Sequence, residues 1–177
     1  MGKDEQTLTK DKLEFVSGII TNKQGNVLIL RRRDDLKLDP GKDDFCSGHM
    51  KEGEIPLQSM YRELQEETGI QPHHVKTIEN LGDIETPHEK LKGTKTHLYH
   101  IEIDFTEEKI NEMIQNMEDP EMARATYVED IEYLKKMQQE TKNFRVAYTK
   151  EMELVLDKLA EKISKRKENE KNICQEK

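Results

Sequence analysis

The stretch from residue 48 to residue 70 constrains this chain most, because it predicts a helix with two defined ends and a dense group of carboxylates. Pro56 suits the first turn of a helix, where its missing N–H would have no partner anyway. Gly69 supplies the left-handed residue that commonly ends a helix. The sequence therefore predicts a loop followed by a helix over 56–68.

One face of this predicted helix is apolar and should pack on a core, if residues follow one another at about 100°. Its members are Leu57, Tyr61, Leu64 and Thr68. A neighbouring face carries three glutamates, Glu63, Glu66 and Glu67. Carboxylates this close repel one another, so a helix built only for stability would avoid them. A divalent cation would remove the repulsion, because carboxylate oxygens are the ligands that Mg²⁺ and Mn²⁺ prefer. The alternative is a solvated acidic face.

The same stretch resembles the Nudix box, which is a glycine, five residues, a glutamate, seven residues and then Arg-Glu-apolar-x-Glu-Glu-x-Gly-apolar. Its fixed positions are occupied by Gly48, Glu54, Arg62, Glu63, Leu64, Glu66, Glu67, Gly69 and Ile70. A match at every fixed position is a specific signal, and the chain is identified as a member of the Nudix hydrolase family. The resemblance covers about residues 13 to 140.

The resemblance implies a reaction and a metal. Family members hydrolyse a nucleoside diphosphate linked to another group, by attack of water on phosphorus, and this chemistry depends on charge neutralisation and alignment. By resemblance, the carboxylates of Glu63, Glu66 and Glu67 and the backbone carbonyl of Ser47 hold Mg²⁺, which Mn²⁺ can replace. We therefore expect a Mg-dependent pyrophosphohydrolase.

Two further roles follow from the resemblance. Arg62 and Glu54 are expected to pair and to orient the helix, and a misplaced helix would still cost activity. The general base is either Glu63 or a glutamate outside the box, for which Glu121 is the first candidate and Glu118 the second.

Three consecutive arginines, Arg31 to Arg33, lie at the end of the strand-like run 26–32. The planar guanidinium fork binds phosphate oxygens well, so Arg31 and Arg32 are candidate substrate-binding residues. A solvated strand end is the other interpretation.

The remainder of the chain alternates between strand-like and helix-like patterns without a regular strand–helix repeat, which indicates an α+β fold or α/β/α layers. The strand-like runs are 13–21, 26–32, 75–84 and 96–105, and helices are expected after Thr106, after Asp130 and over 144–163. The resemblance sharpens this to the Nudix fold, a mixed sheet sandwiched between helices, with an extra C-terminal helix. We expect a flexible segment over 1–12, the domain over 13–140, a packed helix over 141–163 and a disordered tail over 164–177.

Composition excludes several classes of function. A net charge of −8 and a pI near 5.4 argue against binding to long nucleic acids. No stretch is apolar enough to span a membrane and the first residues do not predict a signal peptide. Cys46 and Cys174 match no metal or redox spacing. We expect a cytoplasmic protein, monomeric or homodimeric, whose partner is a small nucleotide.

Three alternatives use the same fold. A nucleotide sensor would bind without cleavage but would be expected to lose box carboxylates. An isopentenyl-diphosphate isomerase would need a reactive thiol, for which Cys46 is the candidate. An RNA 5′-end hydrolase would need a track for a polyanion. The substrate stays open between nucleoside triphosphates, including oxidised ones, and ADP-ribose or nucleotide sugars, for which Pro87 is a weak indicator.

Overall fold

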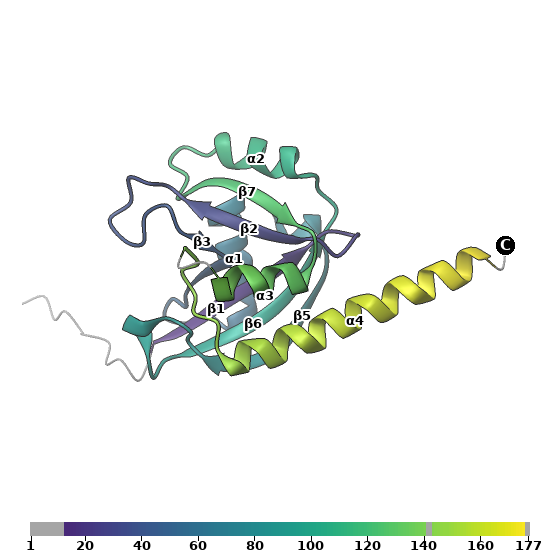
Figure 1. Cartoon of the computed structure of the whole chain (residues 1–177). Helices are drawn as coiled ribbons and strands as arrows, with labels where there is room; N and C mark the ends of the chain where they lie inside the picture. The colour runs from purple at the N-terminus through teal and green to yellow at the C-terminus, as the bar shows by residue number, and fades with distance from the viewer. Residues whose placement is uncertain (1–12, 141–142, 176–177) are drawn as a thin grey trace, which may run out of the picture.

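A seven-stranded mixed sheet forms the middle layer of the computed structural model, which describes residues 13–140 and 143–175 (Figure 1). Its strands are β1 (Glu14–Thr21), β2 (Val27–Arg32), β3 (Asp43–Asp44), β4 (Cys46–His49), β5 (Val75–Glu85), β6 (Lys95–Ile103) and β7 (Met122–Val128). The order is β3-β2-β1-β6-β5, with β4 paired to β1 and β7 paired to β2. β1 and β6 run parallel, whereas β2 and β4 run antiparallel to β1.

Helices cover both faces of this sheet. α1 (Pro56–Thr68) and α2 (Glu107–Gln115) bury their apolar side chains in one core cluster, with Met60, Leu64, Ile110 and Ile114. α3 (Ile131–Glu140) and α4 (Lys150–Gln175) bury theirs in a second cluster on the opposite face, with Leu134, Met152, Leu156 and Leu159. The expected α+β fold with helices on both sides of a mixed sheet is confirmed.

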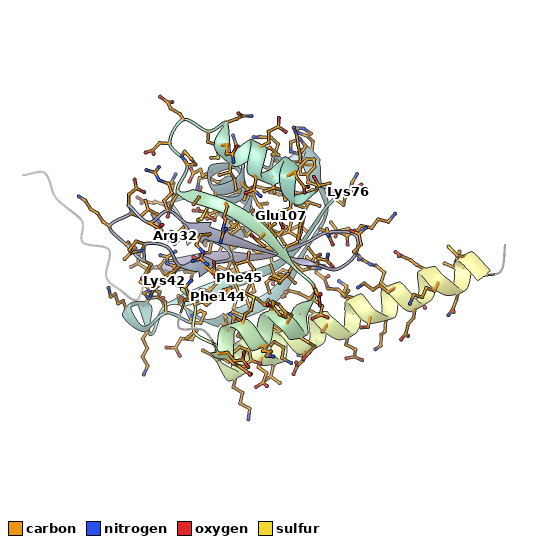
Figure 2. The ribbon with its side chains drawn as sticks, turned by 45° about the horizontal axis from the view of Figure 1, so that its top comes forward. Arg32, Lys42, Phe45, Lys76, Glu107 and Phe144 are labelled. Carbon is orange, nitrogen blue, oxygen red and sulfur yellow. The ribbon has the colours of Figure 1, made fainter. Side chains whose placement is uncertain are left out.

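The segment before α4 differs from the expected helix over 144–163. Helix α4 begins only at Lys150, and Phe144 instead forms a bridge with Asp43 of β3. The backbone N–H of Arg145 donates to the carbonyl of Asp43 at 2.8 Å, and the rings of Phe45 and Phe144 pack with centroids 5.3 Å apart (Figure 2). Backbone pairing with the sheet and burial of an aromatic ring therefore replace helical bonds here.

The expectation of a disordered tail was wrong for residues 164–175, because α4 continues to Gln175 and extends past the edge of the sheet (Figure 1). Lys165 pairs with Glu161 one turn earlier at 2.6 Å, and Arg166 binds Glu102 of β6. Residues of high helix propensity and spaced charge pairs sustain a polar helix without an apolar face. The expected flexible segment 1–12 and residues 176–177 lie outside the described residues.

Candidate active site

Local sequence defines both ends of α1, the helix that carries the box glutamates. Pro56 occupies the first helical position, and the side chain of Gln58 accepts a hydrogen bond from the backbone N–H of Ile55 at 3.1 Å. Gly69 ends the helix with a φ of 76° and donates its N–H to the carbonyl of Gln65. The predicted bounds 56–68 are confirmed, because these residues satisfy backbone groups that a helix end leaves unpaired.

The inward face of α1 differs from the expected one at Leu57, whereas Leu64 and Thr68 are buried as expected. Leu57 is 38% exposed, whereas Met60, Leu64 and the carboxylate-bearing Glu63 and Glu67 are buried. Apolar periodicity alone placed Leu57 inside. The structure instead turns two of the glutamates towards the sheet, which is a costly arrangement unless their charges are satisfied.

Glu67 is the most deeply placed of the three glutamates. It is 3% exposed, and one of its carboxylate oxygens accepts a hydrogen bond from the backbone N–H of Ser47 at 3.0 Å. Burial raises the pKa of Glu67 well above its ordinary value, and the nearby carboxylates of Asp44, Glu63 and Glu121 raise it further. Glu67 therefore lies among several other carboxylates.

Arg62 forms ion pairs with the other three glutamates of the box, Glu54, Glu63 and Glu66. Its Nε donates to Glu54 at 2.6 Å, and its Nη1 donates to Glu63 at 2.5 Å and to Glu66 at 3.0 Å. Its Nη2 also donates to the backbone carbonyl of His49 at 2.9 Å. The hydrogen bond from Arg62 lowers the pKa of Glu54 to about 2, so this pair stays charged. Arg62 and Glu54 thus lie where a pair that orients α1 should lie.

Glu63 is held between Arg62 and the backbone of β4. Burial raises its pKa although the Arg62 guanidinium acts in the opposite direction. Its carboxylate lies directly against Gly48, which leaves no room for a side chain at that position. A side chain at residue 48 would therefore displace the Glu63 carboxylate from this position.

The strand-end arginines lie elsewhere than expected. Arg31 binds Asp43 at 2.7 Å and the carbonyl of Gly41 at 2.7 Å. Arg32 is 4% exposed and binds Glu121 together with the carbonyl of Leu38. Neither arginine is among the residues that line the cavity described next. Their guanidinium groups are used within the protein, because β3 and the segment before β7 bring carboxylates to them.

A cavity of 480 Å³ joins these elements. The box residues of β4 and α1 line it, and Glu121 reaches it from the segment before β7. Its apolar lining residues include Leu38, Pro87, Leu91, Val146 and Met152. Of the residues predicted for the site, the cavity brings together Ser47, Arg62, Glu63, Glu66, Glu67 and Glu121.

Sequence reasoning missed two residues of this cavity, Asp44 and Arg145. Asp44 is fully buried at the cavity wall, and Nη1 of Arg145 binds its Oδ2 at 3.0 Å. Burial raises the pKa of Asp44 although Arg145 acts in the opposite direction. The two residues are 101 positions apart in the sequence. The one local signal for a sheet contact is that Arg145 follows an aromatic residue in a short strand-like run.

The donor set fits a hard divalent cation. Two buried carboxylates, Glu63 and Glu67, have pKa values raised by burial, and Glu66 lies on the same helix at 50% exposure. A cation would satisfy these oxygens, which are the ligand type that Mg²⁺ prefers. Within residues 13–140 and 143–175, however, no three His, Cys, Asp or Glu side chains are arranged as a metal site, since Arg62 holds Glu63 and Glu66. Among the same residues, no helix is apolar and long enough to cross a bilayer.

One sequence relative and two solved structures are similar to this chain. Over 70 residues, the chain is 41% identical to the 8-oxo-dGTP diphosphatase of Escherichia coli (strain K12), a match covering 40% of this chain and 54% of that relative. The chain thus matches about half of that protein's length. The structure of DR0079 from Deinococcus radiodurans has a TM-score of 0.60 at 19% identity, covering 88% of both chains. A Caenorhabditis elegans Ap4A hydrolase, solved as a binary complex, has a TM-score of 0.58 at 17% identity, covering 86% of this chain and 98% of that one.

The sequence model of the NUDIX domain matches residues 14–148, from the first strand of the sheet to the segment before α4. This range contains the box glutamates, Glu121 and Arg145. The chain belongs to the Nudix family.

Proposed function

We propose that this chain hydrolyses the pyrophosphate bond of a nucleoside diphosphate linked to another group. One observation carries the proposal: the carboxylates of Glu63 and Glu67 are buried in the wall of a cavity large enough for a nucleotide. The Glu67 carboxylate is buried beside the carboxylates of Asp44, Glu63 and Glu121, which is costly, and such sites are typical of function rather than of stability.

Glu63, Glu66 and Glu67, with the carbonyl of Ser47, would hold Mg²⁺, or Mn²⁺ in its place. When bound, the cation supplies the positive charge that neutralises the phosphate oxygens and acidifies the attacking water. Arg62 and Glu54 position α1, because Arg62 contacts Glu63 and Glu66 and is itself held by Glu54. Breaking this pair would misplace two carboxylates at once.

We assign the general base to Glu121 rather than to Glu63. Glu121 lines the cavity from outside the box, and it is close enough to Glu67 to raise the pKa of that carboxyl. Glu63 and Glu121 each pair with an arginine, but Glu63 already has a proposed role as a metal ligand. The buried Arg32 binds Glu121, so it is a positioning residue for the base instead of a phosphate ligand.

A nucleoside triphosphate is the substrate class that we propose first. The name of the E. coli relative gives a deoxynucleoside triphosphate as that protein's substrate, and its matched segment is 41% identical to this chain. The acidic balance of the chain, −8, disfavours long polyanions.

Product analysis tests this proposal. Purified full-length protein is incubated with Mg²⁺ and nucleoside triphosphates, ADP-ribose, dinucleoside polyphosphates or 5′-triphosphate RNA. Release of a nucleoside monophosphate and pyrophosphate from triphosphates, abolished by a chelator, is the expected result. Tight nucleotide binding without cleavage of any substrate would overturn it in favour of a sensor.

A further inference from the structure

Arg33, the last of the three consecutive arginines, contacts the segment that carries Glu121. Residues 118–121 lie between α2 and β7, outside any helix or strand. Nη1 of Arg33 donates to the carboxylate of Asp119 at 2.7 Å and to the carbonyl of Pro120 at 3.0 Å. The backbone N–H of Arg33 donates to the carbonyl of Glu121 at 3.2 Å. One arginine thus contacts three consecutive residues, of which Glu121 is the last.

The loop that follows β2 fixes the position of Arg33 in turn. Its Nε donates to the carboxylate of Asp35 at 2.8 Å. Its backbone carbonyl accepts a hydrogen bond from the N–H of Gly41 at 3.2 Å. The loop 33–41 therefore closes on Arg33 and restricts the directions in which its side chain can extend.

Strand pairing between β2 and β7 is irregular just beside Glu121. Arg31 lies opposite Arg124, and the register then shifts, so that Arg32 lies opposite Met122. A bulge of this kind disrupts the ladder locally and changes the direction of the side chains beside it. Glu121 directly precedes this irregular pair, and its side chain is 46% exposed. Contacts outside the ladder are therefore needed to hold Glu121 in one place.

Arg32 and Arg33 hold different parts of the same segment. The buried Arg32 binds the carboxylate of Glu121, whereas Arg33 binds backbone carbonyls at Pro120 and Glu121. The ion pair of Arg33 with Asp119 is exposed, and such pairs contribute little to stability. The side chain of Arg33 therefore restricts where this stretch of chain lies more than it stabilises the fold.

We propose that Arg33 is a positioning residue for Glu121, because its guanidinium fixes the backbone that directs the Glu121 carboxylate into the cavity. This inference rests on the proposed function and on the assignment of the general base to Glu121. A displacement of about 1 Å in a reacting group can lower the rate by roughly 10²-fold. The loss of Arg33 should therefore appear in the catalytic rate.

Arg33→Ala removes the side-chain contacts but keeps the backbone bond to Glu121. Its kcat for the best nucleoside triphosphate should fall roughly 10-fold or more, while the KM values for nucleotide and for Mg²⁺ and the thermal unfolding stay close to those of the wild type. Arg33→Lys keeps a donor that can bond to one carbonyl, so it should recover part of the loss. Arg124→Ala, an exposed arginine of β7, is the matched control and should leave kcat unchanged.

A double-mutant cycle on kcat distinguishes positioning of the base from a general effect on structure. In a Glu121→Gln background there is no base left to position, so Arg33→Ala should lower kcat no further. An equal fold-loss in both backgrounds, or no loss in the wild type, would overturn the inference and leave the hydrolase standing.

Amide hydrogen exchange tests the same inference without any reaction. Peptides that cover residues 117–124 should exchange faster in Arg33→Ala than in the wild type and in Arg124→Ala, because exchange reports local opening of the backbone. If the wild type cleaves none of the nucleotides, the proposed function falls and these exchange rates decide: faster exchange would support the contact of Arg33 with this segment as what holds it, and unchanged exchange would overturn it.

Discussion

The carboxylate of Glu63 on α1 lies against the backbone of Gly48 on β4: a β-carbon at residue 48 would be 2.1 Å from the carboxyl carbon of Glu63. Atoms cannot approach so closely. A side chain at residue 48 would therefore push the Glu63 carboxylate towards Arg62 or into the buried interior. The position of a proposed metal ligand thus depends on the absence of a side chain on a facing strand.

Gly48→Ala should therefore displace Glu63 and lower kcat by roughly 10²-fold or more, because a preorganised charge in the site is moved. Steady-state kinetics at saturating Mg²⁺ measure this loss. A double-mutant cycle on the free energy of unfolding isolates the cause. Gly48→Ala should cost less in a Glu63→Ala background than in the wild type, with a coupling of about 0.5–3 kcal/mol. Additive costs would contradict a direct clash.

Glu67→Gln should nearly abolish Mg-dependent turnover, by roughly 10²-fold or more, while the fold stays intact. The amide can still accept the hydrogen bond from Ser47, but it brings no charge for a cation. Because burial raises the pKa of Glu67, the ionised form is unfavourable in the metal-free protein, and the variant should be at least as stable as the wild type in chelator. Glu52→Gln, at an exposed loop position, is the control. Wild-type-like turnover of Glu67→Gln would exclude this site.

Glu121→Gln tests the assignment of the general base. The amide retains an acceptor for Arg32 but cannot take a proton, so kcat should fall roughly 10²- to 10⁴-fold and the acidic limb of the pH–rate profile should disappear. The KM for Mg²⁺ should stay unchanged, since Glu121 is not a proposed ligand. A larger loss in Glu63→Gln, with that limb still present in Glu121→Gln, would transfer the role to Glu63.

The buried His100, which is not part of the proposed active site, should make the free energy of unfolding depend on pH. Burial lowers its pKa from 6.5 to about 4, and its ring bonds to Thr21 Oγ1 at 2.8 Å. Between these values the unfolded chain binds more protons than the folded one, so the free energy of unfolding should fall as the pH decreases from 6.5 towards 4. The loss from this residue approaches about 3 kcal/mol at the lower limit.

Urea unfolding across that pH window measures the slope. His100→Gln should flatten it, whereas His73→Gln, at an exposed position, should leave it unchanged. An equal slope in the wild type and in His100→Gln would show that His100 contributes nothing to it.

Two leucines of α4, one buried and one exposed, test how this helix packs on the sheet. Leu156 is fully buried in the second core cluster, and Leu154, two residues earlier, is 53% exposed. Leu156→Ala should lower the free energy of unfolding by about 2–5 kcal/mol, because it removes buried surface and leaves a cavity. Leu154→Ala should change it by less than about 0.5 kcal/mol. Equal small effects in the monomer would favour a role of α4 in association between chains.

Local chemistry explains why so much of the box was predictable. The bounds of α1 follow from Pro56 and Gly69, whose backbone preferences act in any context, and the order of the box residues identified the family. Leu57 shows the limit of the same reasoning. Helical periodicity placed it inside, but the helix is oriented by Arg62 and by the contact of Glu63 with Gly48, and Leu57 remains 38% exposed.

The sequence by itself determined the elements whose signals are local: the strand runs, the ends of α1 and the carboxylates that the box supplies. The tertiary structure decided which groups meet. Arg32 became a partner of Glu121, 89 residues away, and Arg145 reached Asp44, 101 residues away, because strands β2, β3 and β7 and the segment before α4 are adjacent only after folding. Charge pairs of this kind depend on distances between distant residues, and a periodic pattern along the chain contains no information about them.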